Sequence, residues 1–280
     1  MQTAELDDAL AAIARRMVAG KMLVVTGAGI STASGIPDYR DKDGVRRGRP
    51  PMMYQEFATS EASRKRYWAR STVGWPRVRD ASPNEAHVAL AELSRAGLLG
   101  GLITQNVDGL HQKAGTPDVV DLHGNLHRVR CLDCQAVWAR EAVQDVLLGA
   151  NPALTDVEAI LAPDGDALLA GEFLEGFQLP SCPGCGGIRM KPDVVFFGEN
   201  VAPMVSAQAA SLAADAEAML IVGSSLMAFS AFRLCKALAV RGKPIFALNQ
   251  GMTRADDMLS LKLPVSCERA LPVLRTLIVG

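Results

Sequence analysis

A buried strand that runs directly into a glycine turn is the feature of this 280-residue chain that most restricts its fold. Residues 23–25 read Leu-Val-Val, and Gly27-Ala28-Gly29 follows almost at once. Such a turn lets backbone N–H groups approach a phosphate, which is typical of the first strand of a dinucleotide-binding sheet. The chain therefore begins like a Rossmann unit.

The continuation departs from that unit. The third glycine of the G-x-G-x-x-G pattern should be residue 32, which is Thr32, and Gly35 and Pro37 end any helix after little more than one turn. About 20 residues further on, where an acidic ribose-binding residue is expected, residues 45–47 read Val-Arg-Arg. We therefore expect a loop, carrying Pro37 to Arg40, where a long helix would usually stand.

Strand and helix patterns alternate along most of the chain. We expect helices over 4–19, 55–70, 203–214, 230–241 and 268–278 and from a Ser82 or Asn84 cap to Gly97, with strands over 22–26, 99–104, 193–197, 218–223 and 244–248. Strands separated by helices imply a parallel sheet with right-handed crossovers. The prediction is an α/β protein in three parts: a Rossmann-type parallel-sheet domain (1–45, 83–125 and 190–280), a helical insertion with a cofactor loop (46–82) and an inserted zinc module (126–189).

Composition excludes several classes of protein. A net charge of -1 and a pI near 6.4 argue against a dedicated nucleic-acid binder. We expect the basic runs 46–49 and 64–66 to be solvated surface. The first residues are acidic, without the basic and apolar regions of a signal peptide, and no apolar run is long enough for a membrane span. These features predict a cytoplasmic protein with no direct membrane or nucleic-acid partner.

Two Cys-x-x-Cys pairs, Cys131 with Cys134 and Cys182 with Cys185, supply four thiolates. Four thiolates are a tetrahedral zinc set, and because sulfur fills every position no site is left for a catalytic water. We expect one structural Zn²⁺ per chain, with a folded excursion between the two pairs. The alternative is a redox motif or two unrelated thiol pairs. Cys235 and Cys267 stand alone.

Polar residues gather where the expected strands end, which is the ligand side of a parallel sheet. Gln105, Asn106 and Asp108 could bind ribose hydroxyls and a carboxamide, although simple loop capping is an alternative. Gly223, Ser224 and Ser225 end one later strand, and Asn249 and Gly251 follow another. Together these two loops could hold an adenosine half.

Among the four histidines, His123 is the best candidate for a general base, because Gly124 marks a turn beside it and the cysteine module begins soon after. His127 could serve equally, whereas His87 and His111 are expected to be packed or exposed imidazoles. The apolar stretch at 193–197, closed by Gly198 and Glu199, reads as a strand whose edge could pair with an extended peptide.

These motifs, in this order, resemble the sirtuin family. The residues that carry the resemblance are Gly-Ala-Gly-Ile-Ser (27–31), Gly-Ile-Pro-Asp-Tyr-Arg (35–40), Thr-Gln-Asn-Val-Asp (104–108), Leu-His-Gly (122–124), the cysteine pairs, Lys-Pro-Asp-Val-Val-Phe-Phe-Gly-Glu (191–199), Gly-Ser-Ser (223–225) and Asn-x-Gly (249–251). Within the family, RYWARSTVGWP (66–76), LAPDGD (161–166), SSLMAFS (224–230) and MTRADD (252–257) are most similar to the class containing the mitochondrial lipoamidase and ADP-ribosyltransferase sirtuin.

The resemblance implies an NAD-consuming protein-lysine deacylase that takes acylated-lysine proteins or peptides. In the implied reaction the acyl-lysine oxygen attacks ribose C1′ as nicotinamide leaves, and a general base then lets the ribose 2′-oxygen attack the acyl carbon. The products are free lysine, nicotinamide and O-acyl-ADP-ribose. The implied catalytic residues are His123 and Asn106, the implied NAD contacts are Gly27, Ala28, Pro37, Asp38, Tyr39, Arg40, Gln105, Asn106, Asp108, Gly223, Ser224, Ser225, Asn249, Gly251 and Cys267, and the implied substrate contacts are Val195, Phe196, Phe197, Gly198 and Glu199.

The acyl group and the balance of activities stay open. Tyr67 and Arg70 have the Tyr-x-x-Arg spacing with which desuccinylase-like sirtuins bind an acidic acyl group, but this stretch could also be helix surface. The alternatives are a plain deacetylase, a longer-chain deacylase, a desuccinylase-like enzyme, a protein ADP-ribosyltransferase, or a weakly catalytic module that senses NAD or docks proteins.

Overall fold

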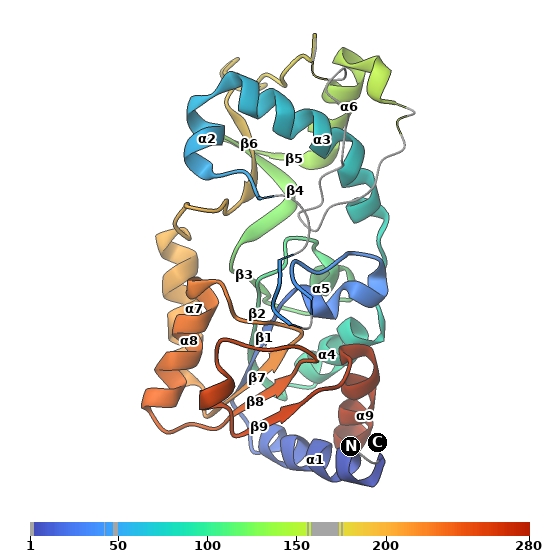
Figure 1. The fold of residues 1–280 in the computed structure, drawn as a ribbon, viewed down its shortest axis with the longest axis vertical. Coiled ribbons are helices and arrows are strands. Elements are labelled where there is room, and N and C mark those ends of the chain that lie inside the picture. The colour runs from blue at the N-terminus through green and yellow to red at the C-terminus, as the bar shows by residue number, and fades with distance from the viewer. Residues whose placement is uncertain (1–2, 42, 47–49, 156, 158–173, 175) are drawn as a thin grey trace.

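The computed structural model describes residues 3–41, 43–46, 50–155, 157, 174 and 176–280 and has a large and a small lobe (Figure 1). Arg47 to Arg49 and the segment 161–166 lie outside the described residues. Both chain ends belong to the large lobe (Figure 1). No helix in the described ranges is long and apolar enough to cross a membrane.

The large lobe is built on a six-stranded sheet, which confirms the predicted Rossmann-type fold. Its strands are β1 (Met22–Thr26), β2 (Leu99–Thr104), β3 (Val120–Asp121), β7 (Ala218–Val222), β8 (Ile245–Leu248) and β9 (Leu261–Leu263). Every pairing is parallel and the order is β3-β2-β1-β7-β8-β9. From β1 the chain adds strands β2 and β3 on one side, and β7, β8 and β9 are added on the other side. Parallel sheets bind ligands at such a switch point, here between β1 and β7.

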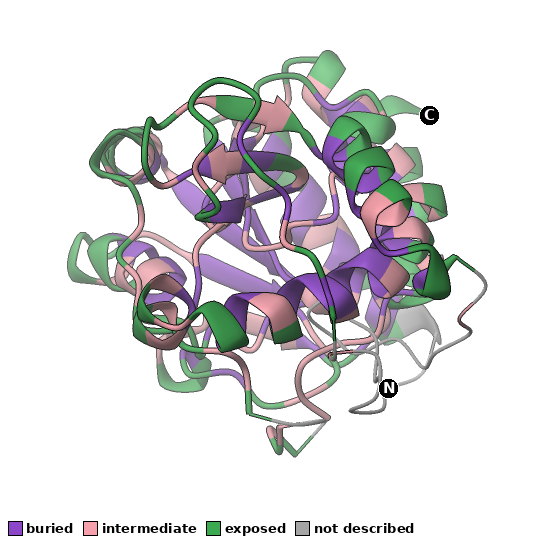
Figure 2. Ribbon diagram, turned by 90° about the horizontal axis from the view of Figure 1, so that it is seen from above, coloured by how far each residue is buried: buried purple, intermediate pink, exposed green. Residues whose placement is uncertain are grey.

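Helices enclose both faces of this sheet, so its central strands β1 and β7 are buried (Figure 2). One face is covered by α1 (Thr3–Val18), α4 (Glu85–Arg95) and α9 (Cys267–Val279), and the other by α7 (Pro203–Asp215) and α8 (Phe229–Val240). In β1, Val24 packs into the first apolar cluster and Val25 into the second, as alternating side chains must. A short helix, α5 (Leu110–Lys113), follows β2.

The small lobe combines both predicted insertions. Its antiparallel sheet has the order β5-β4-β6, with β5 at Val137–Ala139, β4 at Gly124–Cys131 and β6 at Met190–Val194. Its helices are α2 (Tyr54–Thr59), α3 (Glu61–Asp80) and α6 (Arg140–Ala150). Phe57 and Trp68 share one buried cluster with Val129 and Cys131, so the helical insertion and the cysteine module pack as one body.

The predicted strand at 193–197 is wrong in its bounds and its sheet. β6 spans Met190–Val194 and pairs antiparallel with β4 in the small lobe. Val195 N–H still donates to the carbonyl of His123, the residue before β4, at 2.8 Å. The backbone then leaves the sheet at Phe196, whose N–H donates to the Glu199 carboxylate at 2.8 Å. Apolar alternation alone does not reveal which sheet a strand joins.

The predicted helix over 55–70 is two helices. Ser60 separates α2 from α3, and its hydroxyl caps the new helix by accepting from the N–H of Ser63 at 3.1 Å. Arg64, expected on a solvated surface, is buried and donates to the carbonyls of Phe57 and Ala58, both at 3.1 Å. Hydrogen bonds to the free carbonyls at the end of α2 therefore outweigh the cost of burying this cation.

Candidate active site between the two lobes

A cavity of about 1510 Å³ opens between the lobes, above the carboxyl ends of β1 and β7. It is lined by the first glycine turn, by loops after β2, β7 and β8, and by residues of the small lobe. These loops come from distant parts of the sequence, so the sheet order is what brings them together.

Two glycine turns interlock on the floor of the cavity. Gly29 N–H donates to the carbonyl of Gly223 at 2.8 Å, and Gly27 N–H donates to that of Val222 at 3.0 Å. A Cβ added to Gly27 would lie 2.7 Å from that of Ser224, and one added to Gly29 would lie 2.9 Å from Cα of Gly223. The glycines are therefore required by the neighbouring turn as well as by any phosphate.

The loop after the first turn borders the cavity. Two short 3-10 helices, η1 (Ala28–Ile30) and η2 (Thr32–Ser34), replace a long helix, and Gly35 ends the second one at φ 82°. Pro37, Asp38, Tyr39 and Arg40 all line the cavity. The Arg40 guanidinium donates to the carbonyl of Gly44 at 2.8 Å, which closes the loop upon itself.

The polar residues after β2 form a network on Ser31. The Asn106 amide donates to Ser31 Oγ at 3.0 Å, and Ser31 Oγ donates to Asp108 Oδ2 at 2.7 Å. Asp108 lies beside a side cavity of about 30 Å³ rather than the main one, and burial raises the pKa of its carboxyl. Gln105 lines the main cavity and donates to Ser224 Oγ at 2.7 Å. Ser31 was not predicted, although it directly follows the glycine turn.

His123 lines the main cavity and both its ring nitrogens have partners. Nδ1 lies 3.1 Å from the carbonyl oxygen of Gln105 and Nε2 lies 2.7 Å from Ser230 Oγ. A carbonyl only accepts, so Nδ1 carries the proton and Nε2 keeps its lone pair. Burial lowers the pKa of the imidazole, opposed in part by the Gln105 carbonyl, so His123 is a neutral base at Nε2.

The other histidines lie outside the cavity lining of the described chain. His127 Nε2 lies 2.8 Å from the carbonyl oxygen of Asp108 and donates a hydrogen bond to it. His87 and His111 are buried with ring centroids 4.9 Å apart. Burial lowers the pKa of His87 to about 4, and burial together with His87 lowers that of His111 to about 3. Both are therefore neutral, packed imidazoles.

Residues 195–199 all line the cavity on its small-lobe side. Phe197 is 46% exposed, but its carbonyl already accepts from the N–H of Tyr54 at 2.8 Å. The Glu199 carboxylate is held by Lys191 at 3.0 Å. Tyr67 lines the cavity from an aromatic cluster with Phe57 and Phe196, whereas Arg70 is half-buried and is absent from the described lining.

Five remaining predicted contacts line the cavity from the large lobe: Ser224, Ser225, Asn249, Gly251 and Cys267. The Asn249 amide donates to the carbonyl of Gly251 at 2.8 Å, which fixes the turn after β8. Cys267 begins α9 and is buried, and burial raises the pKa of its thiol to about 12. A thiol with this pKa contributes shape rather than nucleophilicity.

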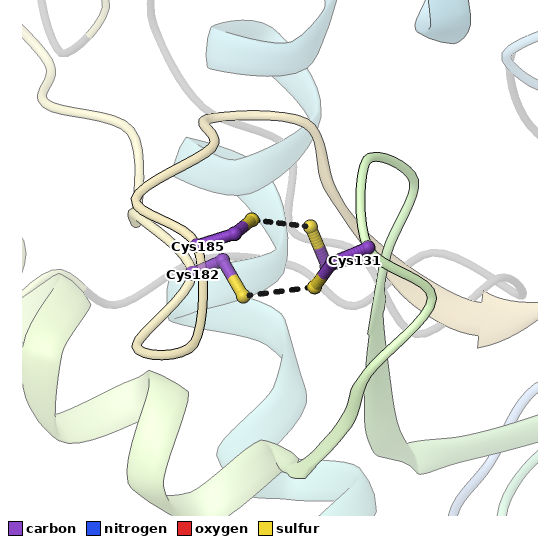
Figure 3. Close-up of side chains that lie close together, drawn as sticks. Cys131, Cys182 and Cys185 are labelled. Atoms are coloured by element: carbon purple, nitrogen blue, oxygen red, sulfur yellow. Dashed lines mark hydrogen bonds between the residues drawn. The ribbon is translucent and has the colours of Figure 1, made fainter.

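The two cysteine pairs meet at one point of the small lobe (Figure 3). None of the four cysteines belongs to the described cavity lining. Cys131 Sγ lies 3.7 Å from Cys185 Sγ, and Cys134 Sγ lies 3.7 Å from Cys182 Sγ. All four sulfurs lie within 4.8 Å of one another. Zn–S bonds of about 2.3 Å in a tetrahedron require S···S distances of about 3.8 Å, so the four thiolates suit one structural zinc ion.

Sheet order, glycine turn and cleft together define a Rossmann-type protein with a nucleotide-sized site between two lobes. The model of the Sir2 family matches residues 27–230, and the chain belongs to that family. Similar proteins include one named NAD-dependent protein deacetylase 3 from Pseudomonas syringae pv. tomato, 58% identical over 95% of this chain and 94% of the relative. Another, NAD-dependent protein deacetylase 2 from Bradyrhizobium diazoefficiens, is 52% identical over 91% and 93%.

Solved structures of Sir2 proteins are similar to this fold. A structure reported under the heading of the mechanism and regulation of Sir2 enzymes superposes with a TM-score of 0.75 at 29% identity, covering 98% of each chain. A complex described as Sir2, p53 peptide and NAD⁺ gives a TM-score of 0.73 at 30% identity over 92% of this chain and 94% of that one.

Proposed function

We propose that this protein is an NAD-consuming protein-lysine deacylase. The observation that carries the proposal is the neutral His123, which borders the same cavity as the interlocked glycine turns. A base and a nucleotide turn in one cleft suit a reaction in which the nucleotide is consumed at its ribose. The names of the relatives, NAD-dependent protein deacetylases, support the same reaction.

NAD would lie across the floor of the cavity. Gly27 and Ala28 would approach its phosphates, and the loops of Ser224, Ser225, Asn249 and Gly251 would hold the adenosine half, closed by Cys267. The nicotinamide end would enter the side cavity, where Pro37, Tyr39, Asn106 and Asp108 lie together. An amide and a carboxyl there match the donor and acceptor of a carboxamide.

The acyl-lysine would enter from the small-lobe side, along residues 195–199. Their exposed Phe197 and the cavity-lining Gly198 support contact with an extended peptide backbone. Each turnover breaks the nicotinamide–ribose bond and the lysine amide bond and consumes one water. Lysine, nicotinamide and O-acyl-ADP-ribose leave. His123 takes the ribose hydroxyl proton on Nε2, and Asn106 keeps Ser31 and the turn of Gly27 in place.

We further propose that the acyl pocket accepts neutral chains longer than acetyl, as expected from the likeness to the lipoamidase-containing class. Tyr67, at the edge of an aromatic cluster on the cavity wall, supports an apolar acyl site. Arg70 lies outside the described lining, which gives less support to an acidic acyl group. A cytoplasmic location also stays a proposal, supported by six cysteines without a disulfide.

The test is a panel of acetyl-, longer neutral acyl- and succinyl-lysine peptides incubated with NAD. We expect nicotinamide, free-lysine peptide and O-acyl-ADP-ribose in equal amounts, fastest for a longer neutral chain. Transfer of ADP-ribose to protein without acyl removal would favour the ADP-ribosyltransferase alternative. NAD binding without nicotinamide release would favour the sensing module.

A further inference from the structure

The hydroxyl of Ser230 lies 2.7 Å from His123 Nε2, the atom that must take the proton in the proposed reaction. Ser230 is the second residue of α8 and lines the cavity together with His123. Ser230 and His123 are 107 positions apart in the sequence. The similarity to Sir2 proteins described above assigns no role to this contact.

The hydrogen bonds around the ring set the direction of this contact. The Gln105 carbonyl accepts from Nδ1, so Nε2 has no hydrogen and Ser230 must be the donor. The ring is thus fixed at both nitrogens, by a backbone atom at the end of β2 and by a side chain at the start of α8. Two bonds at opposite edges of an imidazole fix its plane as well as its tautomer.

A hydroxyl can also partner the ring after proton transfer. The single lone pair of Nε2 holds one hydrogen, so the Ser230 O–H must first rotate away to admit the ribose proton. Nε2 is then a donor, and Ser230 Oγ can accept from it. No covalent bond changes at Ser230, and the proton stays on Nε2. A charge-assisted bond of this kind is stronger than a neutral one, so it favours the protonated ring that the reaction forms.

We propose that Ser230 is a positioning residue that holds His123 as donor before proton transfer and as acceptor after it. The inference rests on the proposed deacylase function. It predicts that the hydroxyl matters for the step that uses the base and for no earlier step. Nicotinamide exchange, the return of labelled nicotinamide into NAD with acyl-peptide present, reports the earlier bond cleavage and needs no base.

The matched pair Ser230→Thr and Ser230→Val separates the hydroxyl from side-chain shape. We expect Ser230→Val to lower kcat for O-acyl-ADP-ribose formation about tenfold, with KM for NAD and the nicotinamide exchange rate unchanged. Ser230→Thr should stay within about threefold of the wild type. Ser211→Ala, at an exposed position on α7, is the control for a serine change elsewhere and should leave both rates unaltered.

Three results would overturn the inference: Thr and Val variants of equal kcat, a Val variant as active as the wild type, or equal loss of exchange and product formation. Failure of the deacylase proposal looks different, because then the wild type itself forms no O-acyl-ADP-ribose. In that case ¹⁵N NMR of the imidazole still tests the contact: the Nε2 resonance should move toward that of a free lone pair in Ser230→Val and stay in place in Ser230→Thr. An unmoved resonance in both variants contradicts the contact.

Discussion

Both lobes bury apolar clusters, but the small lobe adds a buried guanidinium and a four-cysteine cluster to its own. In the large lobe, β1 is buried on both faces between two apolar clusters, one on each side of the sheet. In the small lobe, Arg140 is 1% exposed and its guanidinium lies 5.2 Å from the Trp68 ring and 4.8 Å from the Trp75 ring. A cluster of four cysteines completes that lobe. Both lobes are therefore stabilised by buried apolar area, and the small lobe in addition by a cation–aromatic contact and by the metal that its four cysteines suit.

Removal of zinc should show the difference between the two lobes most strongly. We expect about one zinc ion per wild-type chain. Cys182→Ser should lose the metal and the small lobe with it, since structural zinc contributes roughly 10 kcal/mol or more to folding. Elemental analysis and hydrogen exchange measure this, with protection expected to fall in β4–β6 and to persist in β1 and β7. Cys235→Ser, a buried cysteine of α8 outside the cluster, is the matched control and should keep its zinc. Active protein without zinc would contradict the assignment.

His123→Ala tests the junction between the lobes and should lower deacylation by about 10²–10⁴-fold. NAD binding should survive, because the ring serves proton transfer rather than docking. Steady-state rates and calorimetric NAD titration measure the two effects. His127→Ala, outside the described cavity lining, is the comparison variant. If it were inactive while His123→Ala worked normally, the base would have been misassigned.

Acid should act on the large lobe first. His87 has a pKa near 4 instead of 6.5, so the unfolded chain binds a proton that the folded chain refuses between those pH values. Stability is thus complete above pH 6.5 and falls as pH drops toward 4, by roughly 3 kcal/mol for this residue alone. His111 acts in the same direction. Denaturant melts at pH 7 and 5 measure the loss, and replacing both histidines with Gln should flatten it. A wild type equally stable at both pH values would refute this account.

Arg70→Met should have the smallest effect. Because Arg70 lies outside the described cavity lining, we expect kcat/KM to change less than about threefold and alike for neutral and succinylated peptides. A selective rise in KM for succinyl-lysine, by roughly tenfold or more, would restore the acidic-acyl interpretation. If acetyl-lysine were cleaved faster than every longer chain, both versions of the acyl prediction would be wrong.

Local patterns with fixed spacing were predictable. The glycine turn and the two Cys-x-x-Cys pairs each place their chemistry within a few residues, so the turn type and the ligand set can be inferred without the fold. Likewise, the helices after strands at 203–214 and 230–241 agree with α7 and α8 within a residue or so. Residues that are close together in the sequence therefore allow both the motifs and the bounds of these helices to be predicted.

Contacts between distant segments were not predictable from the residues alone. β9 is short and contains Lys262, and its pairing with β8 depends on the sheet already present. β6 looks like a strand of either sheet until β4 is known to accept it. Ser230 has no local pattern that points to His123, since the contact exists only when α8 starts beside the end of β2.

The central claim, that the acyl group is transferred to NAD-derived ribose, is tested most directly with a peptide whose acyl-lysine carbonyl carries ¹⁸O. The peptide, NAD and wild-type protein are incubated together, and the products are analysed by mass spectrometry. Attack of the acyl oxygen on ribose C1′ predicts O-acyl-ADP-ribose with ¹⁸O on C1′, one nicotinamide for each lysine freed, and no free carboxylic acid. A labelled free carboxylic acid with NAD intact would mean simple amide hydrolysis and would contradict the account.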